Sequence, residues 1–324
     1  MTTGTGMKRI TIISPCYNEG TNVRVCYEAI RSLFDGPLAG YEREHIFADN
    51  ASTDGTVAVL REIAGNDPHL RIIVNARNVG VLRSTFNALK ASSGDATLVM
   101  MAVDLQDPPE LIAQFVRHWE AGHKVVQGVR VKRDEGLIMR TTRWAYYRLV
   151  RRLTPFEIPA DVGEFQLLDR QVVDAVTAFD DHDPYIRGLI AYVGFKPYGI
   201  PYVWRARRRG VSKNRLLTLV DIALNGLLSF TKTPLRVLSA AGLVMAVLSL
   251  LYAIGNLLWL LTRQERPVQP GIPTLIVALF FFSGVQLLFL GLLGEYIVSI
   301  HQQVRFGGRV IEAERINFDR STRA

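Results

Sequence analysis

Cysteine is scarce in this 324-residue chain, which contains only Cys16 and Cys26. Their spacing is not that of a metal site, and both would face a reducing cytosol, so we expect ordinary packing residues. A G-x-G-x-x-G stretch is also missing after the first predicted strand, which argues against a dinucleotide-binding domain. The net charge of +8 is not interleaved with aromatic residues, which argues against a nucleic acid partner.

Charged residues are absent from residues 237–261 and 272–294. Each run matches the roughly 20 apolar residues that cross a bilayer core, so we predict two transmembrane helices, at about 237–261 and 272–298. Lys and Arg gather before the first run and after the second, while the loop 262–271 is short. This distribution predicts a multi-pass protein of the inner (cytoplasmic) membrane with both termini in the cytoplasm. Residues 1–8 are polar, so no cleavable signal is expected.

Apolar runs of strand length alternate with helical patterns through the first 130 residues or so. We predict strands at 9–14, 45–49, 71–75, 96–101 and 124–129, and helices at 22–33, 56–64, 82–91 and 110–120. This alternation predicts an α/β fold with a mostly parallel, doubly wound sheet. The tail 305–318 is expected to add a short strand to this domain or to a neighbouring chain.

The stretch 102–110, Ala-Val-Asp-Leu-Gln-Asp-Pro-Pro-Glu, follows the fourth predicted strand. Its two prolines end the strand and suit the first turn of the next helix. Asp104 and Asp107 therefore lie at the carboxyl end of a buried strand, where open α/β sheets bind ligands. Carboxylates there need a partner, and a divalent cation is the obvious candidate. The alternative is a turn whose aspartates only cap the following helix.

Polar residues also end the first two predicted strands, at 14–20 and 49–56. Together with Asp104 they place three polar strand ends on one edge of a sheet, which suits a base, a ribose and a diphosphate. Asp49 is the strongest ligand candidate of the second cluster, because it is the last residue of a buried strand. Asp54 is expected to cap the helix that follows.

The chain resembles the family 2 glycosyltransferases of GT-A fold in three motifs: Asp-Asn-Ala-Ser-Thr-Asp-Gly-Thr at 49–56, Arg-Asn-Val-Gly at 77–80 and Asp-Leu-Gln-Asp-Pro-Pro-Glu at 104–110. More narrowly, it is similar to the polyprenyl-phosphate glycosyltransferases, the group that contains dolichol-phosphate mannose synthase and the bacterial glucosyl and aminoarabinosyl enzymes. The resemblance continues through 161–167, 207–213, 234–236 and 291–296. We therefore expect a cytoplasmic GT-A catalytic domain at 1–212, an interfacial helical segment at 213–236, a transmembrane hairpin at 237–299 and a cytoplasmic tail at 300–324.

The resemblance also implies roles for individual residues. Nucleotide-sugar binding is expected of Pro15, Tyr17, Asn18, Glu19, Asp49, Asn78, Gly80 and Asp104. A divalent cation, Mg²⁺ or Mn²⁺, is expected at Asp104, Gln106 and Asp107. Catalytic roles are expected of Asp104 and of Asp161 and Glu164, two carboxylates that we place in a loop facing the same region. The acceptor phosphate is expected to bind Arg130, Arg143, Arg207 and Lys213.

Two departures from the family pattern affect these expectations. Ala102 stands where the first aspartate of an Asp-x-Asp pair is common, so its contact is absent or is supplied by Asp107, Gln106 or water. Glu164 and Gln166 stand where Asp and Arg are usual, which alters the expected contacts with the sugar.

A phosphate acceptor fits the abundance of arginine. A phosphate monoester has a second pKa of about 6 and is already anionic near neutrality. Such an acceptor needs positioning and charge neutralisation more than a general base. For Arg208, Arg209 and Lys232 we favour the alternative of a basic face that binds lipid headgroups.

The predicted activity is inverting transfer of a sugar from a nucleotide sugar, UDP-glucose or a similar UDP- or GDP-hexose, to undecaprenyl phosphate or a similar polyprenyl phosphate. The expected partners are this donor, this acceptor, membrane lipid and, by resemblance, further copies of the chain in a tetramer. One rival is a processive polysaccharide synthase, disfavoured because residues 141–144 are Thr-Thr-Arg-Trp rather than Gln-x-x-Arg-Trp. Another is a donor-binding scaffold without catalysis, suggested by Ala102.

Overall fold

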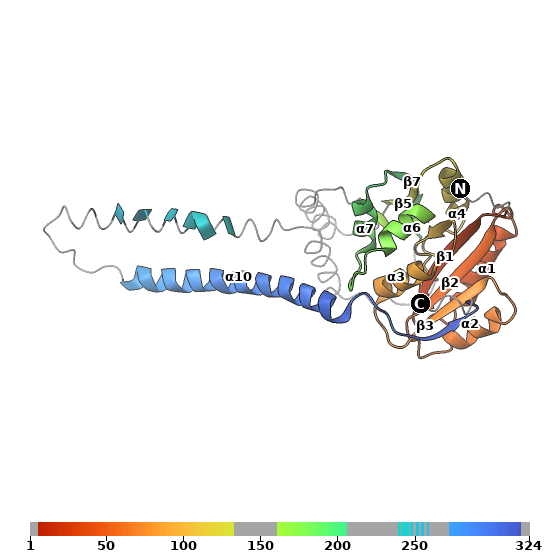
Figure 1. Ribbon diagram of the computed structural model, residues 1–324, viewed down its shortest axis with the longest axis horizontal. Coiled ribbons are helices and arrows are strands. Elements are labelled where there is room, and N and C mark those ends of the chain that lie inside the picture. The colour runs from red at the N-terminus through yellow and green to blue at the C-terminus, as the bar shows by residue number, and fades with distance from the viewer. Residues whose placement is uncertain are drawn as a thin grey trace. The chain divides into compact units, whose positions relative to one another are not determined.

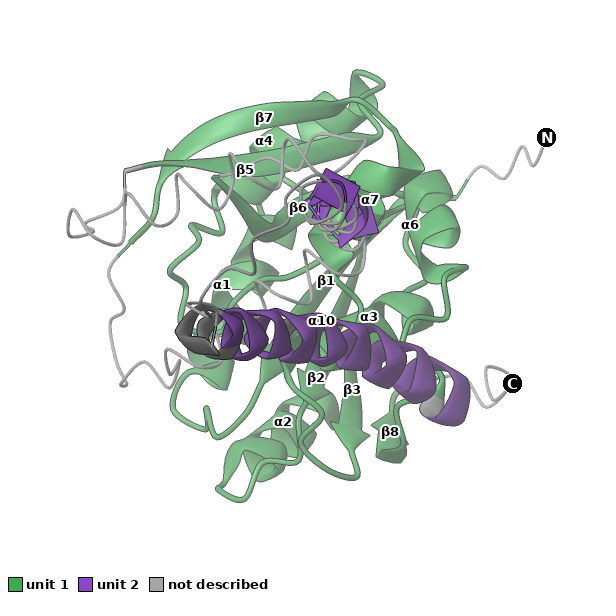
Figure 2. Cartoon of the chain, turned by 90° about the vertical axis from the view of Figure 1, so that its left-hand side faces the viewer, with its two compact units in different colours: residues 1–226, 306–324 green, residues 227–305 purple. Residues whose placement is uncertain are grey.

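The computed structural model describes residues 6–132, 161–205 and 272–318, together with scattered positions between 239 and 258. The chain divides into two compact units (Figure 2). The first combines residues 1–226 with residues 306–324, and the second is residues 227–305.

One eight-stranded sheet forms the centre of the first unit, in the order β7-β5-β6-β4-β1-β2-β3-β8 (Figure 1). Its strands are β1 (Arg9–Cys16), β2 (Glu42–Asp49), β3 (Leu70–Asn75), β4 (Ala96–Leu98), β5 (Val125–Lys132), β6 (Val162–Asp169), β7 (Pro197–Val203) and β8 (Glu312–Ile316). β4, β1, β2 and β3 are parallel neighbours, and β5 is parallel to β7. β6 and β8 run antiparallel to their neighbours.

The strand directions bring the expected site residues to one edge of the sheet. Because β6 is antiparallel to both β4 and β5, the strands β1 to β5 and β7 all point the same way. Their carboxyl ends meet the amino end of β6 at what we call the carboxyl edge, which carries Tyr17, Asp49, Asp104, Arg130 and Asp161.

Helices cover both faces of the sheet. One hydrophobic core joins the sheet to α1 (Val23–Phe34), α2 (Thr56–Ala64) and α4 (Leu111–Glu120), and the other face is covered by α3 (Val81–Ala91), α6 (Arg170–Thr177) and α7 (Ile186–Val193). Figure 1 shows α1 and α3 on opposite sides of β1 and β2. Ile12 and Ile13 in β1 are both fully buried although they point to opposite faces, as expected for a strand covered on both sides.

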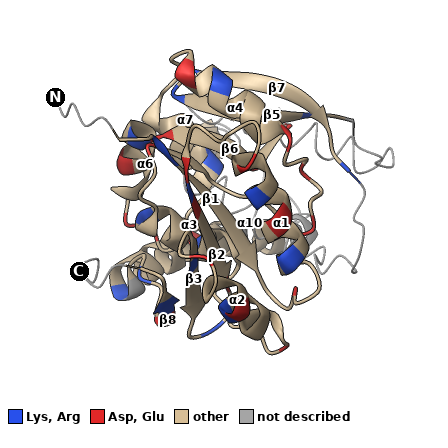
Figure 3. Cartoon of the chain, turned by 90° about the vertical axis from the view of Figure 1, so that its right-hand side faces the viewer, with Lys and Arg blue, Asp and Glu red and all other residues tan. Residues whose placement is uncertain are grey.

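The outer surfaces of the helices are charged. Figure 3 shows Lys and Arg beside Asp and Glu on α1, α2 and α4, and Arg24 of α1 pairs with Glu62 of α2 at 2.8 Å. The N-cap residue of α2 is Gly55, and the Asp54 carboxylate before it accepts a hydrogen bond from the first helical N–H, that of Thr56, at 2.9 Å.

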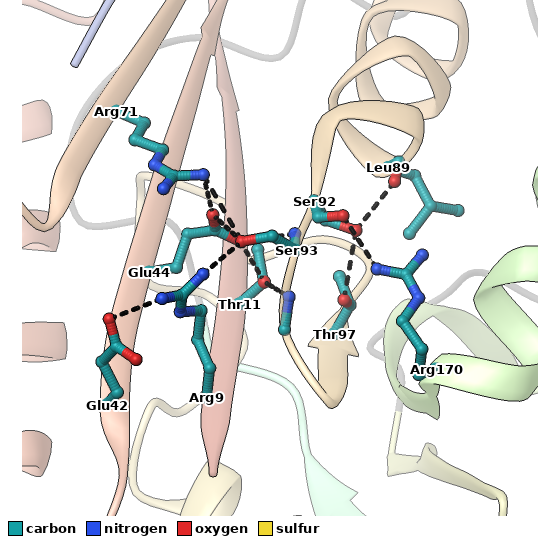
Figure 4. A network of polar contacts seen from close by, with 11 residues as sticks. Arg9, Thr11, Glu42, Glu44, Arg71, Leu89, Ser92, Ser93, Thr97 and Arg170 are labelled. Carbon is teal, nitrogen blue, oxygen red and sulfur yellow. Dashed lines mark hydrogen bonds and ion pairs between the residues drawn. The ribbon is translucent and has the colours of Figure 1, made fainter. Parts of the chain in front are cut away.

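A polar network fastens the opposite, amino edge of the sheet (Figure 4). Glu44 of β2 is 2% exposed and accepts hydrogen bonds from the Thr11 hydroxyl, from Arg71 and from Ser93, whose N–H lies 2.8 Å away. Ser93 belongs to the turn between α3 and β4, so the network ties this turn to β1, β2 and β3. Gly94 follows it at a close approach, because a Cβ there would lie 2.5 Å from the Thr11 Oγ1.

The second unit contains most of α10 (Ile272–Phe306). Its segment Ala278–Arg305 is long and apolar enough to cross a membrane, and large side chains along it, such as Phe280 and Leu290, are exposed. The second predicted span therefore coincides with a helix, which continues beyond residue 298. The first predicted span is described only at scattered positions, which are helical, and the interfacial segment 213–236 lies outside the described residues.

The α/β class predicted from the sequence is confirmed, and each strand and helix expected before residue 130 is observed. The helix predicted at 56–64 has the same ends in the structure, and the other elements are shifted at one or both ends. The fourth strand is shorter than predicted, because β4 ends at Leu98. The tail strand is confirmed as β8, which adds to the edge of β3. The sequence did not show that β6 enters the sheet in the antiparallel direction between β4 and β5.

Candidate active site

Three loops at the carboxyl edge each contain a non-glycine residue in the left-handed conformation. These are Asn18 after β1 (φ 55°), Ala51 after β2 (φ 62°) and Leu105 after β4 (φ 55°). This conformation costs about 1–2 kcal/mol for residues other than glycine, although asparagine tolerates it better. Such strain concentrates at functional sites, and here it marks the same three loops as the sequence motifs.

Asp49, the last residue of β2, is fully buried. Its Oδ1 accepts the Ser52 N–H at 2.9 Å, and the Ser52 hydroxyl donates to its Oδ2. The Cys16 Sγ lies 3.8 Å from that same oxygen, and burial raises the pKa of the thiol well above its usual range. Cys16 is therefore an uncharged packing residue, as predicted, and Asp49 sets the shape of its own loop.

The loops after β1 and β2 brace each other. The Asn18 N–H donates to the Ser52 Oγ at 2.9 Å, and the Thr53 N–H donates to the Asn18 Oδ1 at 2.8 Å. The Glu19 N–H donates to the Thr56 Oγ1 at 2.9 Å. The structure thus brings Asn18 and Glu19, both predicted to bind the donor, beside the loop of Asp49.

An amide network fixes the motif at 77–80 against the same loop. The Asn50 Oδ1 accepts the Val79 N–H at 2.9 Å, and the Asn50 Nδ2 donates to the Asn78 Oδ1 at 2.9 Å. The Asn78 Oδ1 also accepts the Gly80 N–H at 3.0 Å. Gly80 has a φ of 86°, which favours glycine, and α3 begins directly after it. Asn78 and Gly80, both predicted to bind the donor, are therefore adjacent to the Asp49 loop.

The loop after β4 presents Asp104 and Gln106, both half-buried. The Asp104 Oδ1 accepts the Gln106 N–H at 3.4 Å, and the Gln106 carbonyl accepts the Arg205 N–H at 3.0 Å. The second contact ties this loop to the chain that leaves β7.

Asp107, in contrast, is buried and engaged by two other elements. Its Oδ1 lies 3.4 Å from the Arg130 Nη2 of β5 and accepts a hydrogen bond from the Tyr202 hydroxyl of β7. The Arg130 Nε in turn donates to the Tyr202 oxygen at 2.9 Å, and its guanidinium lies 4.9 Å from the Trp204 ring centroid. Burial raises the pKa of Asp107, and Arg130 and the Tyr202 hydroxyl offset only part of the increase. Asp107, which was predicted to bind a cation, therefore forms an ion pair with Arg130, which was predicted to bind the acceptor phosphate.

Asp161 and Glu164 lie near this cluster, but the prediction that both are in a loop is wrong for Glu164. It belongs to β6, because the residues around it pair with β4 and β5. Glu164 forms an ion pair with Arg187 of α7, with 3.0 Å between Oε1 and Nε. Asp161 precedes the strand, and its carbonyl accepts the Arg130 N–H at 2.9 Å. The other predicted phosphate ligands, Arg143, Arg207 and Lys213, lie outside the described residues.

The described residues suit a cation that is bound partly by the substrate. They suit less well a cation whose ligands all come from the protein. Within the described ranges, no group of three or more His, Cys, Asp or Glu side chains is arranged to hold a metal. Mg²⁺ is commonly bound by one or two carboxylates, with substrate phosphates and water as the other ligands. Asp104, next to Gln106, fits that arrangement, whereas Asp107 is committed to Arg130 and Tyr202.

The glycosyl transferase family 2 model matches residues 11–177, which include the loops of Asp49 and Asp104 and the strand of Arg130. The chain belongs to glycosyl transferase family 2. A bactoprenol glucosyl transferase derived from prophage SfII, of Shigella flexneri, is 33% identical over 92% of this chain and 95% of its own length. The glycosyltransferase YkcC of Bacillus subtilis is 34% identical over 91% of this chain and 90% of its own length.

A solved structure of glucosyl-3-phosphoglycerate synthase from Mycobacterium tuberculosis, in complex with Mn²⁺, UDP-glucose and phosphoglyceric acid, is also similar. The similarity has a TM-score of 0.49 at 21% identity and covers 68% of this chain and 78% of that one.

Three further residues of this family 2 glycosyltransferase contact predicted site residues but were not predicted from the sequence: Tyr202, Trp204 and Arg187. None belongs to a motif that we singled out, although Tyr202 and Trp204 directly precede the basic segment that begins at Arg205. Asn50 lies inside a recognised motif, but its role in holding Asn78 follows only from the structure.

Proposed function

We propose that this glycosyltransferase moves a hexose-type sugar from a UDP- or GDP-sugar to a polyprenyl phosphate, with inversion, at the cytoplasmic face of the membrane. The product would be a lipid-linked sugar for modification or assembly of cell-surface glycans. Similarity to a bactoprenol glucosyl transferase over almost the whole chain supports a lipid acceptor. The apolar helix α10 is consistent with a membrane enzyme.

The donor would bind across the three loops of the carboxyl edge. Asp49, Asn18 and Glu19 would contact the base and the ribose, together with Asn78 and Gly80 of the adjoining loop. Pro15 and Tyr17, which lead from β1 into the first loop, belong to the same proposed surface. The diphosphate would then extend toward Asp104 in the third loop.

Asp104 and Gln106 would hold a divalent cation together with the diphosphate. The cation supplies Lewis-acid stabilisation of the charge that develops on the leaving nucleoside diphosphate. Asp107 would hold Arg130 through their ion pair and would not bind the cation. Asp161 and Glu164, at the amino end of β6, would orient the sugar or the acceptor.

The observation that carries this proposal is the Arg130–Asp107 pair, which places a guanidinium beside the loop that begins at Asp104. An arginine there suits a phosphate, because its N–H groups match phosphate oxygens and its charge is permanent. The acceptor phosphate is already anionic near neutrality, so attack on the sugar needs orientation and no general base. Arg143, Arg207 and Lys213 would complete the phosphate site.

The test is incubation of the purified full-length protein with undecaprenyl phosphate, Mg²⁺ or Mn²⁺ and a panel of radiolabelled UDP- and GDP-sugars. We expect one donor to give a labelled product that partitions into organic solvent, and chelation by EDTA to stop its formation. Absence of labelled lipid with every donor would refute the proposal. Donor binding without product would instead support the scaffold suggested by Ala102.

A further inference from the structure

Tyr202 lies at the meeting point of Asp107 and Arg130, and the proposed function gives it no role. It is in β7 and only 5% exposed. Its hydroxyl donates to the Asp107 Oδ1 and accepts from the Arg130 Nε at 2.9 Å. Strand pairing places it opposite Arg130, since the two residues are partners in the β5–β7 ladder.

Two glycines provide the space for this arrangement. A Cβ on Gly128 of β5 would lie 2.8 Å from the Tyr202 Cε1 and 3.0 Å from the Phe165 Cδ1. A Cβ on Gly163 of β6 would lie 2.9 Å from the Arg130 Nη2. A larger residue at position 128 would displace the Tyr202 ring, and one at position 163 would displace the end of the Arg130 side chain.

The hydroxyl also binds one of the Arg130 nitrogens that could otherwise pair with Asp107. An arginine and a carboxylate left to themselves favour a bidentate pair, in which two nitrogens face two oxygens. Here the Arg130 Nε is bound to Tyr202, and the described pair with Asp107 uses Nη2 alone, at 3.4 Å. The Trp204 ring lies against the guanidinium, 4.9 Å from its carbon, and limits its rotation.

We propose that Tyr202 is a positioning residue that keeps Arg130 in a single-point pair with Asp107, so that the guanidinium is presented to the phosphate of the acceptor. The inference rests on the proposed function, because it assigns Arg130 to that phosphate. Without the hydroxyl, the Arg130 Nε would turn to Asp107, and the resulting bidentate pair would withdraw the guanidinium from the acceptor.

Tyr202→Phe tests this inference with little disturbance of packing, because the ring remains. We expect the KM for polyprenyl phosphate to rise about tenfold, because the loss of one hydrogen bond to a charged group changes a binding constant by about that factor. The KM for the nucleotide sugar should change less than about twofold. Tyr198→Phe is the matched control, because Tyr198 is in the same strand but stacks on His118. It should leave both KM values as in the wild type.

A double-mutant cycle distinguishes positioning from a general structural effect. In an Arg130→Ala background, Tyr202→Phe should have no further effect on the KM for the acceptor. An effect of unchanged size in that background would overturn the inference, as would an equal rise in both KM values in the single variant.

A binding measurement separates this inference from the proposed transfer reaction. Intrinsic tryptophan fluorescence, to which Trp204 beside Arg130 contributes, should report titration of the full-length protein with geranyl phosphate, a short water-soluble isoprenyl phosphate. We expect the Kd to rise about tenfold in Tyr202→Phe and to stay unchanged in Tyr198→Phe. An unchanged Kd in Tyr202→Phe would refute the role of Tyr202 even if transfer is observed. The expected shift would support it even if no donor gives a product.

Discussion

Asp104 and Asp107 are three residues apart in one loop, yet their surroundings give them different roles. Asp104 is half-buried beside Gln106, whereas Asp107 is buried between Arg130 and Tyr202. Sequence reasoning treated both as cation ligands, because spacing alone does not show which carboxylate faces an arginine from a distant strand. Arg130 and Tyr202 are 72 positions apart in the sequence, and only the register of β5 and β7 brings them together.

Replacing Asp104 by Asn removes a negative charge without a change of size, and its effect tests the proposed cation site. We expect cation-dependent sugar transfer to fall by at least about 100-fold, because charge on the leaving diphosphate would lose its counterion. The melting temperature should stay within a few degrees, since the side chain is only half-buried. Asp35→Asn, at the exposed end of α1, is the control and should retain activity. Undiminished transfer by the Asp104 variant would remove this residue from the site.

His45 of β2 gives the fold a dependence on pH. It is fully buried, its Nε2 lies 2.9 Å from the Ser14 Oγ, and burial lowers its pKa from 6.5 to about 3. Between pH 6.5 and about pH 3, His45 binds a proton in the unfolded chain but not in the folded chain. Neutral His45 therefore adds its full contribution to the free energy of unfolding above about pH 6.5, and that contribution is lost as the pH falls.

We therefore expect the free energy of unfolding to decrease by about 2 kcal/mol from pH 7 to pH 5 because of His45 alone. In His45→Gln this decrease in the free energy of unfolding between pH 7 and pH 5 should disappear. Between pH 7 and pH 8 the free energy of unfolding should change with pH as it does in the wild type. Chemical denaturation followed by circular dichroism at each pH measures both. Parallel curves for variant and wild type across the acidic range would show that His45 is not the group responsible.

At the scale of secondary structure, the sequence was informative where strands are buried on both faces. Strands β1 to β5 were predicted because each contains a run of apolar residues. β7 was not, because prolines and exposed positions interrupt its apolar pattern. Polar residues such as Glu164 and Gln166 likewise made β6 look like a loop, although Gln166 is 2% exposed and its amide donates to the Gly163 carbonyl at 2.7 Å.

The network around Glu44 predicts a large effect on stability at the amino edge. Glu44→Gln should lower the free energy of unfolding by about 3 kcal/mol, because Arg71 would lose its buried counter-charge. Glu42→Gln is the control in the same strand, and the pair of Glu42 with Arg9, which is more exposed than that of Glu44, should contribute less than about 1 kcal/mol. Denaturant unfolding of both variants measures the difference. Equal losses of the free energy of unfolding in the two variants would show that the buried pair contributes no more than the pair of Glu42 with Arg9.

At the scale of the whole molecule, the position of the tail constrains the membrane topology. Residues 306–324 belong to the same compact unit as residues 1–226, and β8 pairs with β3 in its sheet. The chain therefore leaves this unit before residue 227 and returns to it after α10. If α10 crosses the bilayer once, the stretch from 227 to 271 must cross it as well. The predicted span at 237–261 meets this requirement.

Cysteine labelling of intact cells tests that topology. Gln264→Cys, in the loop between the predicted spans, should react with a membrane-impermeant maleimide. Ser321→Cys, in the tail, should react only after the cells are permeabilised. The native thiols of Cys16 and Cys26 are buried and serve as the unlabelled background. Labelling of Ser321→Cys in intact cells, or protection of Gln264→Cys, would contradict a hairpin with both ends in the cytoplasm.

We propose that the group receiving the sugar is a lipid-borne phosphate, held at the carboxyl edge by Arg130. The most direct measurement compares undecaprenyl phosphate with undecaprenol, which has the same tail and no phosphate, as acceptors for the full-length protein with its radiolabelled donor. We predict labelled lipid from the phosphate and at most a trace from the alcohol, because the alcohol lacks the anion that arginine binds and would need a general base. Equal labelling of both acceptors, or labelling of neither while a sugar polymer accumulates, would contradict the account.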